Sequence, residues 1–169
     1  GSKGHGDTMN DLGLIAAEAD GMSAERPRLI EGGLAVDDRG SVMFVNDFDL
    51  DEIRRFYVIS NHAVGFVRAW HYHRHERKYV VALKGAVLVQ AVAVDNEEHP
   101  SRDLEVHRFV LSDVSPSALV IPPRYAHGTM TLSAGAKVIF FSDSTLKESL
   151  SDDIRYAADY WGSWNVTRR

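Results

Sequence analysis

Apolar and polar residues alternate in short runs along most of this chain, and Val, Ile, Phe and Tyr dominate the runs. Gly, Pro, Asp or Ser bound most of them, which is typical of β-strands closed by turns. No long helical pattern separates the runs, so they predict an antiparallel sandwich or barrel. The expected strands after residue 55 are 56–60, 65–73, 78–83, 86–94, 104–111, 117–122, 128–132 and 136–142.

The remaining segments carry weaker patterns. Residues 29–48 predict two short strands around a turn at Asp37-Asp38-Arg39-Gly40. Residues 49–55 have acids first and bases last, as the helix dipole favours, and predict one or two helical turns. We expect a short helix or an arm that frays at 12–19, and a short amphipathic helix or packed tail at 149–161.

One expected strand departs from alternation. Residues 86–94 (AVLVQAVAV) are almost continuously apolar. A strand of this kind is typically covered on both faces. A partner subunit would provide one such cover.

Composition narrows the class of protein. The 169 residues, 44% of them hydrophobic, fit one domain with a core. We read residues 1–8 as an expression-tag remnant and 9–169 as a single domain. The net charge of −5 argues against a nucleic-acid surface, and the absence of cysteine excludes disulfides and thiolate metal sites. No apolar run is long enough to cross a membrane and no secretory signal is present, so cytoplasmic residence is the default expectation.

The segment Arg68–Glu76 holds three histidines at alternate positions. Alternate side chains of a strand share a face, so His71, His73 and His75 point the same way if the strand persists that far. A neutral imidazole accepts a proton at cellular pH, which suits a base acting next to a carbonyl. A nearby arginine offers a fork of donors to a phosphate or a developing oxyanion.

A further histidine, His127, follows two prolines in the segment 121–128. Together with His71, His73 and Glu76 it supplies the ligand types of a three-histidine, one-carboxylate metal site. The spacing differs from the metal-binding cupin pattern, because His73 and Glu76 are one residue too close and Arg124 stands where that pattern has glycine. A metal-dependent cupin is therefore an alternative reading, and our primary expectation is that no metal is bound.

At these residues the chain resembles the dTDP-4-dehydrorhamnose 3,5-epimerase family, over roughly residues 34–164. Five short elements occur in the family's order with similar spacing. They are Asp37–Gly40, Asn61-His62, Arg68–His73, Lys78–Gly85 and Ile121–Gly128.

The resemblance implies an all-β cupin jelly-roll barrel with short peripheral helices that works as a homodimer without metal or other cofactor. It implies that His71 is the base that removes a proton alpha to the C4 ketone of a nucleotide-diphospho-4-keto-6-deoxysugar. By the same resemblance, Lys78 would help to stabilise the enolate. His73 is a further catalytic candidate.

The resemblance also implies how the substrate, with dTDP as the expected nucleotide, is bound. Arg68 would bind the diphosphate, and Arg39 would reach it from the neighbouring subunit. Asn61 and His127 would line the pocket, and Tyr125 is a further substrate-binding candidate. No nucleic acid or membrane is expected as a partner. The implied role is epimerisation at C3, C5 or both, in deoxysugar and polysaccharide biosynthesis.

The chain lacks the tyrosine that serves as the catalytic acid in the family. The family's Asp-Tyr-Tyr, one tyrosine of which reprotonates the far face, is replaced by Asp143-Ser144-Thr145. The carboxylate that pairs with the histidine base in the family is also missing from its usual position, and Asp159 is the candidate to replace it. The tyrosines that could take over the role of the acid are Tyr72, Tyr125, Tyr156 and Tyr160.

A second resemblance keeps another activity open. The dTDP-4-keto-6-deoxyglucose 3,4-ketoisomerases carry Arg-Gly-x-His-x-His, which is similar to Arg68–His73 with Ala69 in place of glycine. In those enzymes two histidines shuttle protons between neighbouring carbons on one face. A non-catalytic cupin that binds a sugar nucleotide is the remaining alternative.

Overall fold

The computed structural model describes residues 25–169. The tag remnant expected at 1–8 and the helix expected at 12–19 lie outside these residues. Within them the chain is almost entirely β-structure with one short helix, α2 (Leu146–Leu150). The strands are β1 (Arg28–Glu31), β2 (Gly33–Asp37), β3 (Gly40–Phe44), β4 (Arg55–Ser60), β5 (Val67–Tyr72), β6 (Lys78–Lys84), β7 (Ala86–Ala93), β8 (His107–Ser112), β9 (Ser117–Ile121), β10 (Tyr125–Thr131), β11 (Lys137–Ser142) and β12 (Ile154–Arg155).

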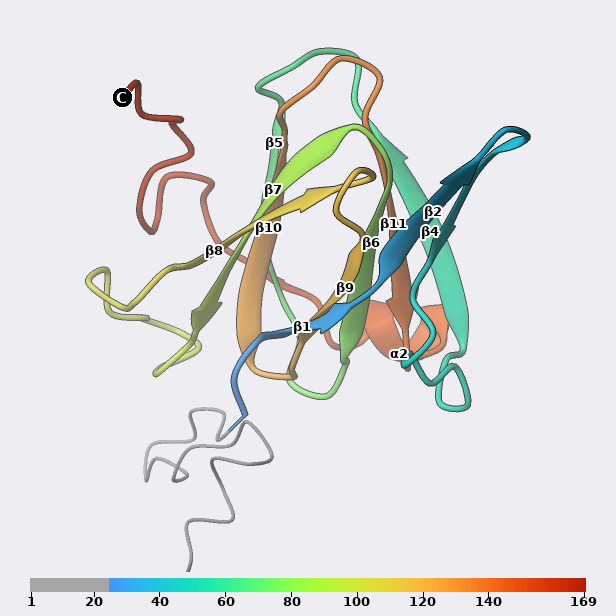
Figure 1. The fold of residues 1–169 in the computed structure, drawn as a ribbon. Coiled ribbons are helices and arrows are strands. Elements are labelled where there is room, and N and C mark those ends of the chain that lie inside the picture. Colours follow the sequence, from blue (N-terminus) through green and yellow to red (C-terminus); the bar gives the residue numbers. More distant parts are fainter. Residues whose placement is uncertain (1–24) are drawn as a thin grey trace, which may run out of the picture.

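Two antiparallel five-stranded sheets form the body of the molecule (Figure 1). One sheet has the order β1-β9-β6-β11-β4 and the other β12-β5-β10-β7-β8. The strands β2 and β3 pair only with each other and form a hairpin that extends away from the sheets (Figure 1). The all-β prediction is confirmed, and no helix of the described residues is long and apolar enough to cross a membrane.

Strand β7 is covered on both faces, as its continuous apolar sequence predicts. Val89 and Ala91 belong to a core cluster between the sheets, whereas Val92 and Val94 join a second cluster on the opposite face. The C-terminal segment supplies the second cover, because the fully buried Trp161 packs there against Trp70. This cover comes from the chain itself rather than from a partner subunit.

The helical turns predicted at 49–55 are wrong. The segment makes a single tight turn in which the Ile53 amide donates to the Leu50 carbonyl, and Arg55 already begins β4. The carboxylate of Asp49 accepts a hydrogen bond from the Asp51 amide at 2.9 Å, so the side chain competes with the helical pattern.

A helix forms instead just before the predicted C-terminal one. Thr145 caps α2, because its side chain accepts from the Glu148 amide while the Glu148 carboxylate accepts from Thr145. This reciprocal capping box is a sequence signature of helix starts. The segment that follows contributes only the two residues of β12, so the packed-tail reading of 149–161 is the correct one.

Strand β5 contains one extra residue opposite β10. His71 pairs with His127 and Arg68 with Thr129, so three steps along β5 face two along β10. Such a bulge turns Arg68 to the same side as His71, although strict alternation would separate them. Gly128 permits it, since a Cβ there would lie 2.5 Å from the Cβ of Ala69.

The C-terminal cover gives a stability prediction. Replacing Trp161 with Ala removes a fully buried indole, and we expect the free energy of unfolding to fall by about 3–5 kcal/mol in urea titrations. The matched control is Val114→Ala at a side chain that is 75% exposed, which should change stability little. A loss below about 1 kcal/mol for Trp161→Ala would contradict the assignment of this segment to the core.

Candidate active site

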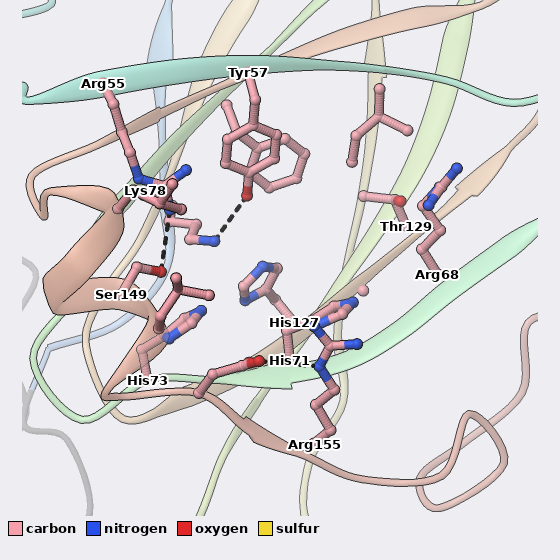
Figure 2. Close-up of a pocket in the computed structure, with 16 residues that line it drawn as sticks. Arg55, Tyr57, Arg68, His71, His73, Lys78, His127, Thr129, Ser149 and Arg155 are labelled. Atoms are coloured by element: carbon pink, nitrogen blue, oxygen red, sulfur yellow. Dashed lines mark hydrogen bonds and ion pairs between the residues drawn. The ribbon is translucent and has the colours of Figure 1, made fainter.

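A cavity of about 360 Å³ lies between the two sheets (Figure 2). Strands β4, β6 and β11 line it from one sheet, and β5, β10 and β12 from the other. Helix α2 closes one side. The lining residues are Arg55, Tyr57, Ile59, Arg68, His71, His73, Lys78, His127, Gly128, Thr129, Phe140, Leu146, Ser149, Leu150, Asp153 and Arg155.

His71 sits at the centre of one wall. On β5 it lies directly opposite His127 of β10 on one side and Arg155 of β12 on the other. Burial, followed by the positive charges of Arg155 and Lys78, lowers the pKa of His71 to about 4. The imidazole is therefore neutral near pH 7 and can accept a proton.

His127 and His73 complete a group of three imidazoles. The ring centroid of His127 lies 6.0 Å from that of His71 and 6.3 Å from that of His73. Burial and the charge of Lys78 hold the pKa values of both His127 and His73 below their ordinary value. Nδ1 of His73 lies 2.5 Å from the carbonyl oxygen of Asp152, which can only accept, so this nitrogen carries the hydrogen. Nε2 of neutral His73 is then an acceptor.

Lys78 and Tyr57 form the opposite wall. The ammonium of Lys78 donates to the hydroxyl of Tyr57 at 2.7 Å, and it lies above the rings of Tyr57 and Phe140. Burial lowers the pKa of Lys78 to about 8, although the charge of Glu76 opposes this. Burial, then the charge of Glu76, raises the pKa of Tyr57, so its hydroxyl keeps its proton.

A comparison with protein-family models shows to which family the chain belongs. The family model described as dTDP-4-dehydrorhamnose 3,5-epimerase matches residues 29–164, which is most of the sequence. The chain belongs to this family. Among curated proteins no match is found.

Solved structures agree on the fold. An rmlC epimerase of Mycobacterium tuberculosis is 18% identical, with a TM-score of 0.64, and the match covers 86% of this chain and 73% of the epimerase chain. An epimerase of Sulfolobus tokodaii is 23% identical (TM-score 0.66, coverage 83% and 81%). A 3,4-ketoisomerase of Thermoanaerobacterium thermosaccharolyticum, solved with TDP, is 20% identical (TM-score 0.60, coverage 79% and 90%). The cupin jelly-roll prediction is confirmed.

The residues that the family resemblance nominated for chemistry come together. His71, His73, Lys78 and His127 all line the cavity, as does Arg68. They come from strands of both sheets, so this convergence depends on the fold and not on sequence proximity.

Tyr57, the tyrosine that lines the cavity, was not among the candidates predicted from the sequence. Three of the candidate hydroxyls donate hydrogen bonds to Glu97 or Pro100, outside the cavity; they belong to Tyr72, Tyr156 and Tyr160. Tyr125 packs in the core cluster between the sheets and does not line the cavity.

Alternation in β4 is the signal that could have found the tyrosine. Phe56 and Val58 are exposed, whereas Tyr57 and Ile59 turn inward and line the cavity. Tyr57 and Ile59 therefore share the inward face of β4. Figure 2 shows Tyr57 projecting from β4 toward Lys78.

Arg68 and Arg155 line the cavity and have polar partners of their own. Nε of Arg68 donates to Oδ1 of Asn61 at 2.7 Å, and Nδ2 of Asn61 donates to Thr131 at 2.8 Å. Asn61 thus orients Arg68 and does not itself line the cavity. Nε of Arg155 donates to the carboxylate of Asp153 at 3.1 Å. Arg155 and Asp153 were not among the sequence candidates.

Two predicted positions lie elsewhere. Arg39 is exposed at the turn of the β2–β3 hairpin, paired with Asp37, so within this chain it does not contact the cavity. His75 does not share the face of His71 and is exposed, because β5 ends at Tyr72. The amides of residues 74 and 75 donate to the Asp152 carboxylate at 2.8 and 2.9 Å, which turns the chain away.

The candidate metal ligands do not fit a metal. The carboxylate of Glu76 is held by the guanidinium of Arg55 at 3.0 Å and by two serine hydroxyls, and it faces the ammonium of Lys78. A cation there would lie among two positive side chains, which is electrostatically unfavourable. Across residues 25–169 no group of three or more His, Cys, Asp or Glu is arranged to hold a metal.

The electrostatics of His71 give a second prediction. Because burial and Arg155 hold its pKa at about 4, replacing Arg155 with Gln should raise that pKa. NMR titration of the imidazole Hε1 signals, with the His71→Ala spectrum to assign the resonance, measures this directly. A variant that titrates at the same pH as the unsubstituted protein would contradict the assigned contact.

Proposed function

We propose that the chain epimerises a nucleotide-diphospho-4-keto-6-deoxysugar at C3, C5 or both. The observation that carries the proposal is the placement of a neutral histidine and a protonated tyrosine on opposite walls of one cavity. His71 comes from one sheet, and the Tyr57–Lys78 pair comes from the other. Inversion at a carbon requires that the proton leave on one face and return on the other.

The proposed reaction begins with proton removal. A ring nitrogen of His71 takes the proton from a carbon next to the C4 ketone, and the electron pair of that C–H bond moves to the ketone oxygen. Lys78 supplies a preorganised, buried positive charge that stabilises the resulting enolate. Tyr57 then donates its proton to the opposite face of the same carbon, and the C4 carbonyl forms again.

The cycle closes by proton exchange with the surroundings. Tyr57 regains a proton from Lys78 through their hydrogen bond, Lys78 takes up a proton from solvent, and His71 releases its proton to solvent. Atoms and charge balance without a redox step, so the chemistry calls for no cofactor. The family's own tyrosine position, Ser144 or Thr145 here, is not needed in this scheme.

Two arginines that line the cavity suit the diphosphate. They are Arg68 and Arg155, and Asn61 fixes the orientation of Arg68. Guanidinium groups bind phosphate oxygens through charge-assisted hydrogen bonds. In the proposed assembly, a homodimer, Arg39 of the hairpin adds a further contact from the second subunit. A solved ketoisomerase and a monoepimerase carry TDP or dTDP, which supports thymidine as the nucleoside.

A 3,4-ketoisomerase is the second candidate, and one observation favours it. His73 lines the same wall as His71, with Nδ1 bonded to the Asp152 carbonyl and Nε2 left as an acceptor. Two bases on one wall suit proton transfer between neighbouring carbons on one face of the sugar. The product distinguishes the two activities, since a ketoisomerase yields a 3-keto sugar.

Deuterium uptake tests the proposal. In D₂O with dTDP-4-keto-6-deoxyglucose, the unsubstituted protein should place deuterium at C3 or C5, and His71→Ala should reduce the rate by at least about 100-fold because the base is lost. Nucleotide binding should persist in that variant. The control is His75→Ala, four residues from His71 and exposed, which should exchange normally. Exchange by His71→Ala at the unsubstituted rate would refute the role of this base.

Tyr57→Phe separates inversion from proton removal. The change deletes the hydroxyl and keeps the ring that stacks on Phe140 at 5.2 Å. We expect exchange at the original configuration to continue, while formation of the epimer slows by at least about tenfold. Tyr72→Phe, outside the cavity, is the matched control. Equal losses of exchange and inversion would count against Tyr57 as the acid.

A further inference from the structure

Glu76 is a buried carboxylate that does not line the cavity and has no part in the proposed chemistry. Its side chain is completely inaccessible to solvent. Oε1 accepts hydrogen bonds from Ser142 at 2.5 Å and from Arg55 at 3.0 Å, and Oε2 accepts one from Ser149 at 2.8 Å. These partners belong to β11, β4 and α2, so one carboxylate joins three elements.

The same carboxylate faces two groups of the proposed site. Nζ of Lys78 lies 3.8 Å from Oε1, and Nδ1 of His73 lies 3.3 Å from Oε2. Glu76 is thus close both to the ammonium on one wall and to an imidazole on the other.

Lys78 depends on this contact because little else favours its charge. It is 4% exposed, and burial lowers its pKa, as does the charge of Arg55. Glu76 is the largest influence in the opposite direction, and the more distant Asp153 adds a smaller one. The other groups that face Lys78 are the Tyr57 hydroxyl and neutral imidazoles, which carry no negative charge.

We propose that Glu76 is a positioning residue that keeps Lys78 charged. Its buried hydrogen bonds fix one negative charge beside the ammonium, so the ammonium persists in a cavity that would otherwise favour the neutral amine. The inference rests on the function proposed above for the use of that charge. The link between Glu76 and Lys78 itself is independent of any activity.

The primary test is the titration of Lys78 in Glu76→Gln. The chain has five lysines, so ¹³Cε labelling gives few signals, and a Lys78→Met spectrum assigns the relevant one. Lys78 should titrate at about 8 in the unsubstituted protein. In Glu76→Gln we expect a pKa at least about one pH unit lower, as the loss of an opposite charge within a few ångströms predicts. An unchanged pKa would overturn the proposal.

The control variant removes an equal charge elsewhere. Glu105→Gln changes a carboxylate that is 75% exposed, and Lys78 should titrate as before. If Glu76→Gln does not fold, the reciprocal measurement decides. Coupling between two sites is mutual, so Lys78→Met should raise the pKa of Glu76, seen through its ¹³Cδ signal. A Glu76 pKa that is unmoved in Lys78→Met would equally overturn the proposal.

Activity provides a separate readout. With deuterium exchange as the assay, the alkaline limb of the kcat/KM profile should follow the deprotonation of Lys78. It should move to lower pH in Glu76→Gln, because the unprotonated amine carries no positive charge to stabilise the enolate. A limb that stays in place while the NMR pKa moves would refute the use of this charge. If the unsubstituted protein exchanges no deuterium at any pH, the proposed function fails, while the NMR titration still decides the role of Glu76.

Discussion

Burial of ionisable groups between two sheets is the constraint on which the site depends. Lys78 is buried, and a single fully buried carboxylate, that of Glu76, is the main influence that favours its charge. The same burial keeps the imidazoles of His71 and His127 neutral. A fixed cation and neutral bases in one enclosure are what enolate chemistry needs, since charge stabilisation is strongest where water is excluded.

The sheets place these groups by simple geometry. His71 is flanked by Arg155 and His127 on the two neighbouring strands, so its electrostatics follow from strand pairing. The bulge in β5 brings Arg68 to the same side, and Gly128 leaves space for it. Arg68 and His71, proposed as the diphosphate contact and the base, therefore share one wall, although alternation alone would part them.

Much of this could be predicted from the sequence, because alternation and motif order are local signals. The strand positions and the all-β class follow from them, whereas the convergence of His71, Lys78 and Arg68 was expected only from the family resemblance. The extent of β5 could not be predicted, since it is ended by the distant Asp152 carboxylate, which binds the amides that follow the strand. The helical reading of 49–55 failed because a short-range Asx contact at Asp49 outweighs charge order.

The candidate acid was missed for a different reason. No family motif placed a replacement tyrosine, and Tyr57 is identified only by its face on β4 and its contact with Lys78. The role of Glu76 was hidden in the same way, because its partners Ser142 and Ser149 lie more than 60 residues away in sequence. With solved relatives at about 20% identity, such contacts carry more information than the family name.

The most direct measurement of the central claim is a crystal structure of His71→Asn soaked with dTDP-4-keto-6-deoxyglucose. The account predicts the sugar in the cavity, with its C4 oxygen at hydrogen-bond distance from Lys78 or Tyr57 and residue 71 beside an adjacent carbon. A sugar bound outside the cavity, or a C4 oxygen directed away from both side chains, would contradict it.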